Sequence, residues 1–270
     1  MIVSVSTWAL HRTLGVTWWD TPEQPTKRRA ETYGPGSVSL LDVPARLAAM
    51  GIGTMELCHF HLPTRDAAYL GELRAALAAA DVRLFSLLID AGDITHPEHA
   101  ERDLAWIAGW IEVAETLGAE RARVIAGKQE PDPATLRRSR DGLARLAERT
   151  APRGVRVMTE NWQALLSGPE HVHALLDGLN GTVGLCLDWG NWSGPTRYAD
   201  LAAVAPRAES CHAKTRFVGP GAIDRDDLRR CLGLMQAAGF AGPYTLVDAG
   251  PGDDEWAGLA LQQKAFSSAA

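Results

Sequence analysis

Four short stretches carry the main signal of this sequence: VRVMTEN (155–161), VGLCLDWGN (183–191), ESCHAKT (209–215) and YTLVDAG (244–250). Each is an apolar, β-rich run that ends near an acidic or imidazole side chain, namely Glu160, Asp188, His212 and Asp248. Parallel strands of a barrel bring their C-terminal ends to one face, so these four side chains are expected to converge there. Three carboxylates and one imidazole form a hard, mostly oxygen-donating site for a divalent cation.

The whole chain alternates short β-type runs with longer Ala-, Leu- and Arg-rich helical stretches about eight times. Most of the β-type runs are continuously apolar, as expected for strands that are buried on both faces. They cover residues 2–8, 54–60, 83–89, 122–127, 155–160, 182–188, 208–213 and 244–248. The pattern predicts a single-domain (β/α)8 TIM barrel over residues 1–270. A doubly wound open sheet is the alternative, but no glycine-rich phosphate fingerprint follows the first strand.

Residues 11–37 do not follow this alternation of β-type and helical runs. The segment HRTLGVTWWDTPEQPTKRRAETYGPGS has no clear period and contains many turn-forming residues. A connection this long is uncommon unless it is functional or disordered. Because it follows the first strand, it is expected to lie over the active face of the barrel. We interpret it as a lid or a dimer contact, with a floppy insertion as the alternative.

Composition excludes several classes of protein. The net charge of −6 argues against a nucleic-acid partner, which usually requires a basic face. The four cysteines show no CxxC spacing and are expected to be reduced core thiols, as in a cytoplasmic protein. No signal segment and no apolar run of membrane-spanning length is seen, so no membrane partner is expected.

The four stretches also resemble a known family. TEN (159–161), LDWGN (187–191), HAK (212–214) and a carboxylate after the eighth strand are similar to motifs of the xylose-isomerase-like superfamily of sugar isomerases and epimerases. The resemblance implies a TIM barrel, a sugar or polyol substrate and, in many members, a homo-oligomer. It also implies one divalent ion, Mn²⁺ in the first place and Mg²⁺ or Co²⁺ as alternatives. The ligands carried over are Glu160, Asp188, His212 and Asp248. The last one departs from the family, which usually has a glutamate there.

The expected chemistry is proton transfer next to a carbonyl group. A cation that bridges a carbonyl oxygen and the neighbouring hydroxyl stabilises an enediolate, and a nearby carboxylate can then remove the proton. On this hypothesis Glu160 is a metal ligand and the catalytic base, and Asp248 is a metal ligand and the opposing acid. The residues expected to contact the substrate are Trp8, His61, Asn191, Lys214 and Arg216.

Other functions remain open at this point. A dehydratase of a keto-polyol or of a shikimate-type acid would use the same metal site. A degenerate barrel that binds a sugar without converting it is a further alternative, because fold does not fix function. An endonuclease of the same superfamily would need a three-zinc cluster, for which the chain has too few histidines and carboxylates at its strand ends.

Overall fold

Eight parallel strands close into a barrel in the computed structural model, which describes residues 1–269. The order around the barrel is β1-β12-β9-β8-β7-β6-β5-β4, and β4 returns to pair with β1. The barrel strands are β1 (Ile2–Ser6), β4 (Thr54–Cys58), β5 (Arg83–Ile89), β6 (Arg121–Val124), β7 (Arg156–Glu160), β8 (Gly184–Asp188), β9 (Ala208–His212) and β12 (Pro243–Leu246). The predicted (β/α)8 barrel is confirmed, and each of the eight predicted strand regions overlaps one of these strands.

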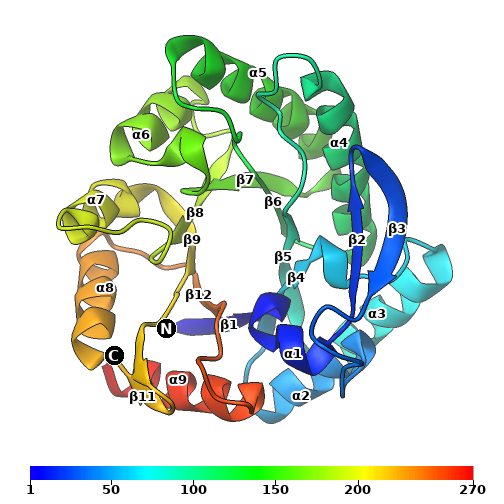
Figure 1. Ribbon diagram of the computed structural model, residues 1–270, viewed down its shortest axis with the longest axis vertical. Coiled ribbons are helices and arrows are strands. Elements are labelled where there is room, and N and C mark those ends of the chain that lie inside the picture. Colours follow the sequence, from blue (N-terminus) through cyan, green and yellow to red (C-terminus); the bar gives the residue numbers. More distant parts are fainter. Residues whose placement is uncertain (270) are drawn as a thin grey trace.

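Helices surround the barrel and follow its strands (Figure 1). They are α1 (His11–Leu14), α2 (Val43–Ala49), α3 (Ala67–Ala79), α4 (Ala100–Leu117), α5 (Pro133–Thr150), α6 (Pro169–Gly178), α7 (Arg197–Val204), α8 (Arg225–Ala237) and α9 (Glu255–Ala269). Local signals in the sequence set their ends. The side chain of Asp132 accepts hydrogen bonds from the backbone amides of Ala134 and Thr135 and so caps α5. Gly118 ends α4 in the left-handed conformation that glycine adopts without strain.

The main core lies between the strands and this ring of helices. Trp110 of α4 and Phe266 of α9 are fully buried there, together with leucines and valines from every layer. Cys58, Cys186, Cys211 and Cys231 are all buried and free, as predicted. Within residues 1–269, no helix is long and apolar enough to cross a membrane.

The segment 11–37 is an ordered part of the structure. It contains α1 and an antiparallel hairpin of β2 (Thr17–Thr21) and β3 (Gln24–Ala30), which stands beside the barrel (Figure 1). The hairpin is tied to the barrel at two points. Arg65 donates a 2.5 Å hydrogen bond to Asp20, and the Lys27 ammonium donates one of 2.7 Å to the carbonyl of Leu62. A second, smaller hairpin consists of β10 (Phe217–Gly219) and β11 (Ala222–Ile223).

Candidate active site

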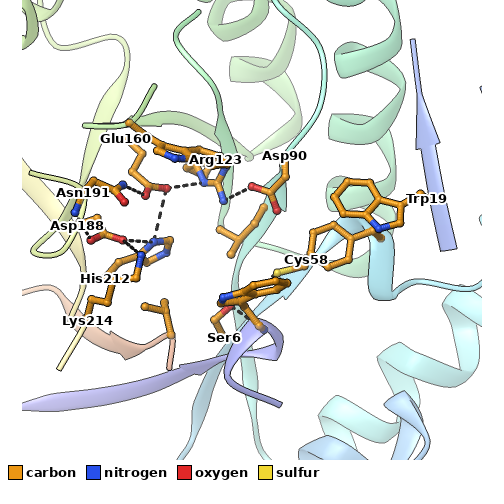
Figure 2. A pocket seen from close by; sticks show the side chains of 15 residues that line it. Ser6, Trp19, Cys58, Asp90, Arg123, Glu160, Asp188, Asn191, His212 and Lys214 are labelled. Atoms are coloured by element: carbon orange, nitrogen blue, oxygen red, sulfur yellow. Dashed lines mark hydrogen bonds and ion pairs between the residues drawn. The ribbon is translucent and has the colours of Figure 1, made fainter. Parts of the chain in front are cut away.

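A cavity of about 310 Å³ lies at the C-terminal ends of the barrel strands (Figure 2). Its ionisable lining residues are Asp90, Arg123, Glu160, Asp188, His212 and Lys214. Its remaining walls are formed by Ser6, Trp8, Trp19, Cys58, Phe60, Leu88, Trp162, Asn191 and Val247. Three of the four predicted metal ligands therefore share one cavity, and each of the three is the last residue of its strand.

Glu160 is the last residue of β7, and its two carboxylate oxygens lie in different environments. Oε1 accepts a 2.7 Å hydrogen bond from the side-chain amide of Asn191. Oε2 has no aligned hydrogen-bond donor within the described chain, although Arg123 Nε lies 3.0 Å away as an ion-pair partner. The same oxygen lies 3.5 Å from Nδ1 of His212. One oxygen of Glu160 is thus fixed by the protein, and the other faces the centre of the site.

Asp188 ends β8 and is held in the same manner. Its Oδ1 accepts hydrogen bonds from the backbone amides of Gly190 and Asn191, at 2.5 and 3.1 Å. The side chain of Asn161 bonds both the backbone amide and the carbonyl of Asp188, which fixes the end of the strand. Oδ2 lies 3.8 Å from His212 Nδ1 and 3.8 Å from Lys214 Nζ. Again one oxygen is fixed and the other faces inward.

His212 ends β9 and completes the arrangement. Its Nε2 lies 2.8 Å from Oε2 of Glu56, a fully buried carboxylate on β4. This contact leaves Nδ1 directed toward the free oxygens of Glu160 and Asp188. Metal-binding histidines usually have their second nitrogen held by a carboxylate in this way. Glu160, Asp188 and His212 therefore present three inward donor atoms that fit a divalent cation.

Cys186 is a further neighbour of this centre. Ligand atoms of Glu160, Cys186 and His212 all lie within 4.8 Å of one another. However, Cys186 is fully buried two residues before Asp188 on β8, below the cavity lining. Burial also raises the pKa of its thiol, which disfavours the thiolate that a metal would need. We therefore place the third donor at Asp188 rather than at Cys186.

The charges in the site alter one another's ionisation. Burial raises the pKa of Glu160, but His212 and Arg123 outweigh it and hold that pKa at about 2. Burial and the neighbouring charge of Glu160 raise the pKa of Asp188. Burial lowers the pKa of His212, but the acidic groups Cys186, Glu160 and Glu56 raise it well above its ordinary value. Several acidic groups thus surround one imidazole, and a bound cation would offset their negative charge.

Asp248 does not join the other three predicted ligands. It is exposed, and its Oδ1 accepts a hydrogen bond from the backbone amide of Gly250. Val247 lines the cavity in its place. The physical reason is strand alternation: Thr245 pairs in register with His212 and shares its inward side, so Val247 also points inward and Asp248 points away. This placement differs from the expectation that Asp248 completes the ligand set and acts as the opposing acid.

Of the five predicted substrate contacts, three line the cavity and two lie outside it. Trp8, Asn191 and Lys214 line the cavity. His61 is buried outside it, where its Nδ1 contacts the hydroxyl of Thr7 at 2.9 Å. Arg216 also lies outside and lines a separate surface depression beyond Lys214.

The lining also includes residues that were not predicted from the sequence, among them Asp90, Arg123 and Trp19. Asp90 follows β5 directly, and Arg123 lies inside β6, where it contacts Asp90 Oδ1 at 2.6 Å as well as Glu160. Asp90 could have been predicted because it directly follows an apolar β-type run, as the predicted metal ligands do. Arg123 could have been noticed because it is a charged residue within such a run. Trp19 of the hairpin reaches the cavity and stacks on Phe60 at a ring separation of 4.2 Å.

With this geometry established, comparison with known proteins identifies the class. Residues 44–262 match the family model of the xylose isomerase-like TIM barrel. The chain therefore belongs to the xylose isomerase-like TIM barrel family, as its motifs had indicated. A search of curated protein sequences finds no significant match.

Solved structures with the same fold include epimerases and a dehydratase. D-psicose 3-epimerase from Clostridium cellulolyticum H10, solved with D-tagatose, is 12% identical with a TM-score of 0.72, and the match covers 100% of this chain and 98% of that one. The probable 3-DHS dehydratase AsbF of petrobactin synthesis in Bacillus anthracis is 12% identical with a TM-score of 0.70, covering 99% of both chains. A family protein from Mycobacterium smegmatis, crystallised in complex with magnesium, is 16% identical with a TM-score of 0.64, covering 99% of this chain and 97% of that one.

Proposed function

We propose that this protein is a divalent-metal-dependent enzyme that moves a proton next to the carbonyl group of a small sugar- or polyol-derived substrate. The observation that carries the proposal is the common arrangement of Glu160, Asp188 and His212. Each has one polar atom fixed by the protein and another directed at a shared centre. Three donor atoms directed at one centre from three different strands, with the other polar atom of each side chain held by the protein, are the arrangement expected of a metal-binding site.

The residues around the centre supply the remaining functions. A divalent ion held by Glu160, Asp188 and His212 would polarise a carbonyl oxygen and stabilise the negative charge that develops on it. His212 and Arg123 keep Glu160 ionised, which is the state in which it can accept a proton from carbon. Lys214 and Asn191 border the same centre, where an ammonium and an amide can hold hydroxyl oxygens. Trp8, Trp19 and Trp162 add apolar surface to the lining, against which the carbon skeleton of a substrate can pack.

The activities named for the matched solved structures agree with the proposed class of reaction. The matched solved structures include sugar epimerases and one probable dehydratase, whose reactions can both begin with removal of a proton next to a carbonyl. A dehydratase is therefore the second candidate, and the apolar side chain of Val247 at the end of β12 is the observation that favours it. A carboxylate at that position could serve as an opposing acid, whereas valine cannot.

Metal titration combined with isotope exchange tests the proposal. Purified protein freed of metal should bind about one Mn²⁺ per chain in isothermal titration calorimetry. The loaded protein should also introduce deuterium from D₂O next to the carbonyl of a ketose such as D-tagatose or L-ribulose. Metal binding without exchange into any carbonyl probe would indicate a barrel that binds but does not convert its ligand. Failure of the protein to bind any divalent ion would contradict the proposal.

A further inference from the structure

Asp90 lies on the wall of the cavity opposite His212 and Lys214. It directly follows β5, and the order β9-β8-β7-β6-β5 places β5 halfway around the eight-stranded ring from β9. In Figure 2 its side chain lies across the cavity from those two residues. Neither metal binding nor proton removal, as proposed above, uses this carboxylate.

The strand and its neighbours fix the direction of the Asp90 side chain. Leu88, two residues earlier on β5, also lines the cavity, so alternation along the strand turns both side chains inward. The backbone amide of Asp90 donates a hydrogen bond of 3.2 Å to Nδ1 of His59, a fully buried imidazole that does not line the cavity. Burial lowers the pKa of His59 well below its ordinary value, so the ring is neutral and can accept this bond.

The carboxylate of Asp90 is only partly satisfied by the protein. Its Oδ1 lies 2.6 Å from a terminal nitrogen of Arg123, and the side chain is 11% exposed. Within residues 1–269, this ion pair is the only polar contact found for the carboxylate, and Oδ2 has no such partner. An ionised carboxylate can only accept hydrogen bonds, so the remaining capacity of Asp90 is for donors that enter the cavity.

The charges on this wall favour hydroxyl groups over anions. Arg123 also lies 3.0 Å from Glu160, so two carboxylates share one guanidinium. A further anionic group placed beside them would meet like charge, which is costly. A hydroxyl group instead donates its proton to the carboxylate, and a charge-assisted hydrogen bond of this kind is about twice as strong as one between neutral groups.

On the basis of the proposed function, we propose that Asp90 binds hydroxyl groups of the substrate and so selects a polyhydroxylated chain or ring that presents an uncharged segment to this wall. Asp90 is then a specificity-determining residue. Because Arg123 links Asp90 to Glu160, a hydroxyl group held by Asp90 also sets the position of the substrate relative to the proposed base.

Binding of neutral ketoses to the Mn²⁺-loaded protein, measured by isothermal titration calorimetry, tests this role. D-tagatose and L-ribulose are the probes. D90N keeps the shape of the side chain but removes its charge, and it should bind the ketose about 10- to 100-fold more weakly because a hydrogen bond to a charged group is lost. D66N, at an exposed aspartate before α3, serves as the control. Equal ketose affinity in D90N and wild type overturns the inference, as does wild-type protein that binds neither ketose.

Monodeoxy derivatives of the ketose that binds separate a direct contact from an effect transmitted through Arg123. The derivative without the hydroxyl group that contacts Asp90 should bind weakly to wild type and lose little further affinity in D90N. The other derivatives should lose the same factor as the parent ketose. An equal loss for every derivative would show that Asp90 acts only through the protein, and it would overturn the inference.

Metal binding keeps failure of this inference apart from failure of the proposed function. Asp90 is not among the proposed ligands, so D90N should take up Mn²⁺ as wild type does. Weaker ketose binding in D90N with intact Mn²⁺ uptake supports the role of Asp90. Unchanged ketose binding overturns that role alone and leaves the metal site in place. Wild-type protein that binds no Mn²⁺ contradicts the proposed function, and the inference falls with it.

Discussion

Oε2 of Glu56 lies 2.8 Å from Nε2 of His212, and this contact between β4 and β9 spans the interior of the barrel. It fixes the imidazole so that Nδ1 faces Glu160 and Asp188. Carboxylate partners of this kind orient a metal-binding histidine and raise its basicity. Glu56 would therefore influence metal binding at the proposed site without lining the cavity itself.

We expect E56Q to weaken Mn²⁺ binding by about 10- to 100-fold, which is the usual effect of removing such a partner. Glutamine keeps the size of the side chain but not its charge, so the barrel should remain folded. Calorimetric titration of Mn²⁺ measures the effect. E72Q makes the same change on the exposed face of α3 and serves as the control. Equal affinities in E56Q and E72Q would mean that Glu56 has a purely structural role.

Asp188, the last residue of β8, and Asp248, which follows β12, provide a matched pair of substitutions. D188N should lose Mn²⁺ affinity by about a hundredfold or more, because a direct ligand counts for at least as much as an outer partner. D248N should bind the ion as the wild-type protein does, since that carboxylate is exposed and bonds the backbone of Gly250. Elemental analysis after gel filtration measures both. Loss of metal in D248N would restore Asp248 to the ligand set that the sequence predicted.

The positions of Val247 and Asp248 show where prediction from this sequence ends. The β-rich runs and their helical partners were strong enough to predict the barrel, and the run ends predicted that Glu160, Asp188 and His212 would meet. The side chain that enters the cavity from β12 depends on register, and a shift of one residue reverses the direction of every side chain. That register is set by pairing with β9, where Thr245 faces His212, and it cannot be read from YTLVDAG alone.

Arg123 and the hairpin illustrate a second limit. An arginine inside an apolar strand is tolerated only because Asp90 and Glu160 neutralise it, and both partners come from other strands. The hairpin likewise depends on contacts that are distant in sequence. Asp20 is paired with Arg65, and Lys27 bonds the carbonyl of Leu62. Local pattern marks Arg123 only as an unusual charge within an apolar run, and it does not reveal the distant ion pairs that hold Arg123 and the hairpin in place.

The Asp20–Arg65 ion pair should hold the hairpin, and with it Trp19, against the barrel. Asp20 is buried, and Arg65 also lies over the ring of Trp110 at 3.9 Å. We expect D20N to destabilise this contact by about 1–3 kcal/mol, because the partly buried guanidinium of Arg65 loses a charged hydrogen-bond partner. Hydrogen exchange of the backbone amides of β2 and β3, followed by mass spectrometry, should therefore speed up while the barrel strands stay protected.

The same hairpin contains the control for that experiment. Glu31 and Arg29 form an ion pair whose side chains are both 50% exposed. E31Q should change stability by less than about 0.5 kcal/mol and leave the exchange rates unaltered, because exposed pairs contribute little. Similar exchange in D20N and E31Q would show that the Asp20 ion pair does not anchor the hairpin.

His61 is expected to make the fold sensitive to acid. Burial, with a smaller effect from His11, lowers the pKa of His61 to about 3. Its Nδ1 contacts the hydroxyl of Thr7, which also accepts a hydrogen bond from the backbone amide of Cys58. In the unfolded chain the imidazole has its ordinary pKa of about 6.5, so below that pH the unfolded state binds a proton that the folded state does not. The stability contributed by neutral His61 is complete above about pH 6.5 and is lost as the pH falls toward 3, by up to about 1.4 kcal/mol per pH unit.

H61Q removes this titration and keeps a side chain that can bond Thr7. Whatever the stability of the variant at neutral pH, its free energy of unfolding should fall less steeply than that of wild type between about pH 6.5 and about pH 4.5. Urea denaturation at several pH values measures the two slopes. H99Q, which removes an exposed imidazole at the start of α4, serves as the control. Parallel slopes in wild type and H61Q would show that His61 is protonated in the folded protein over this range, contrary to its burial.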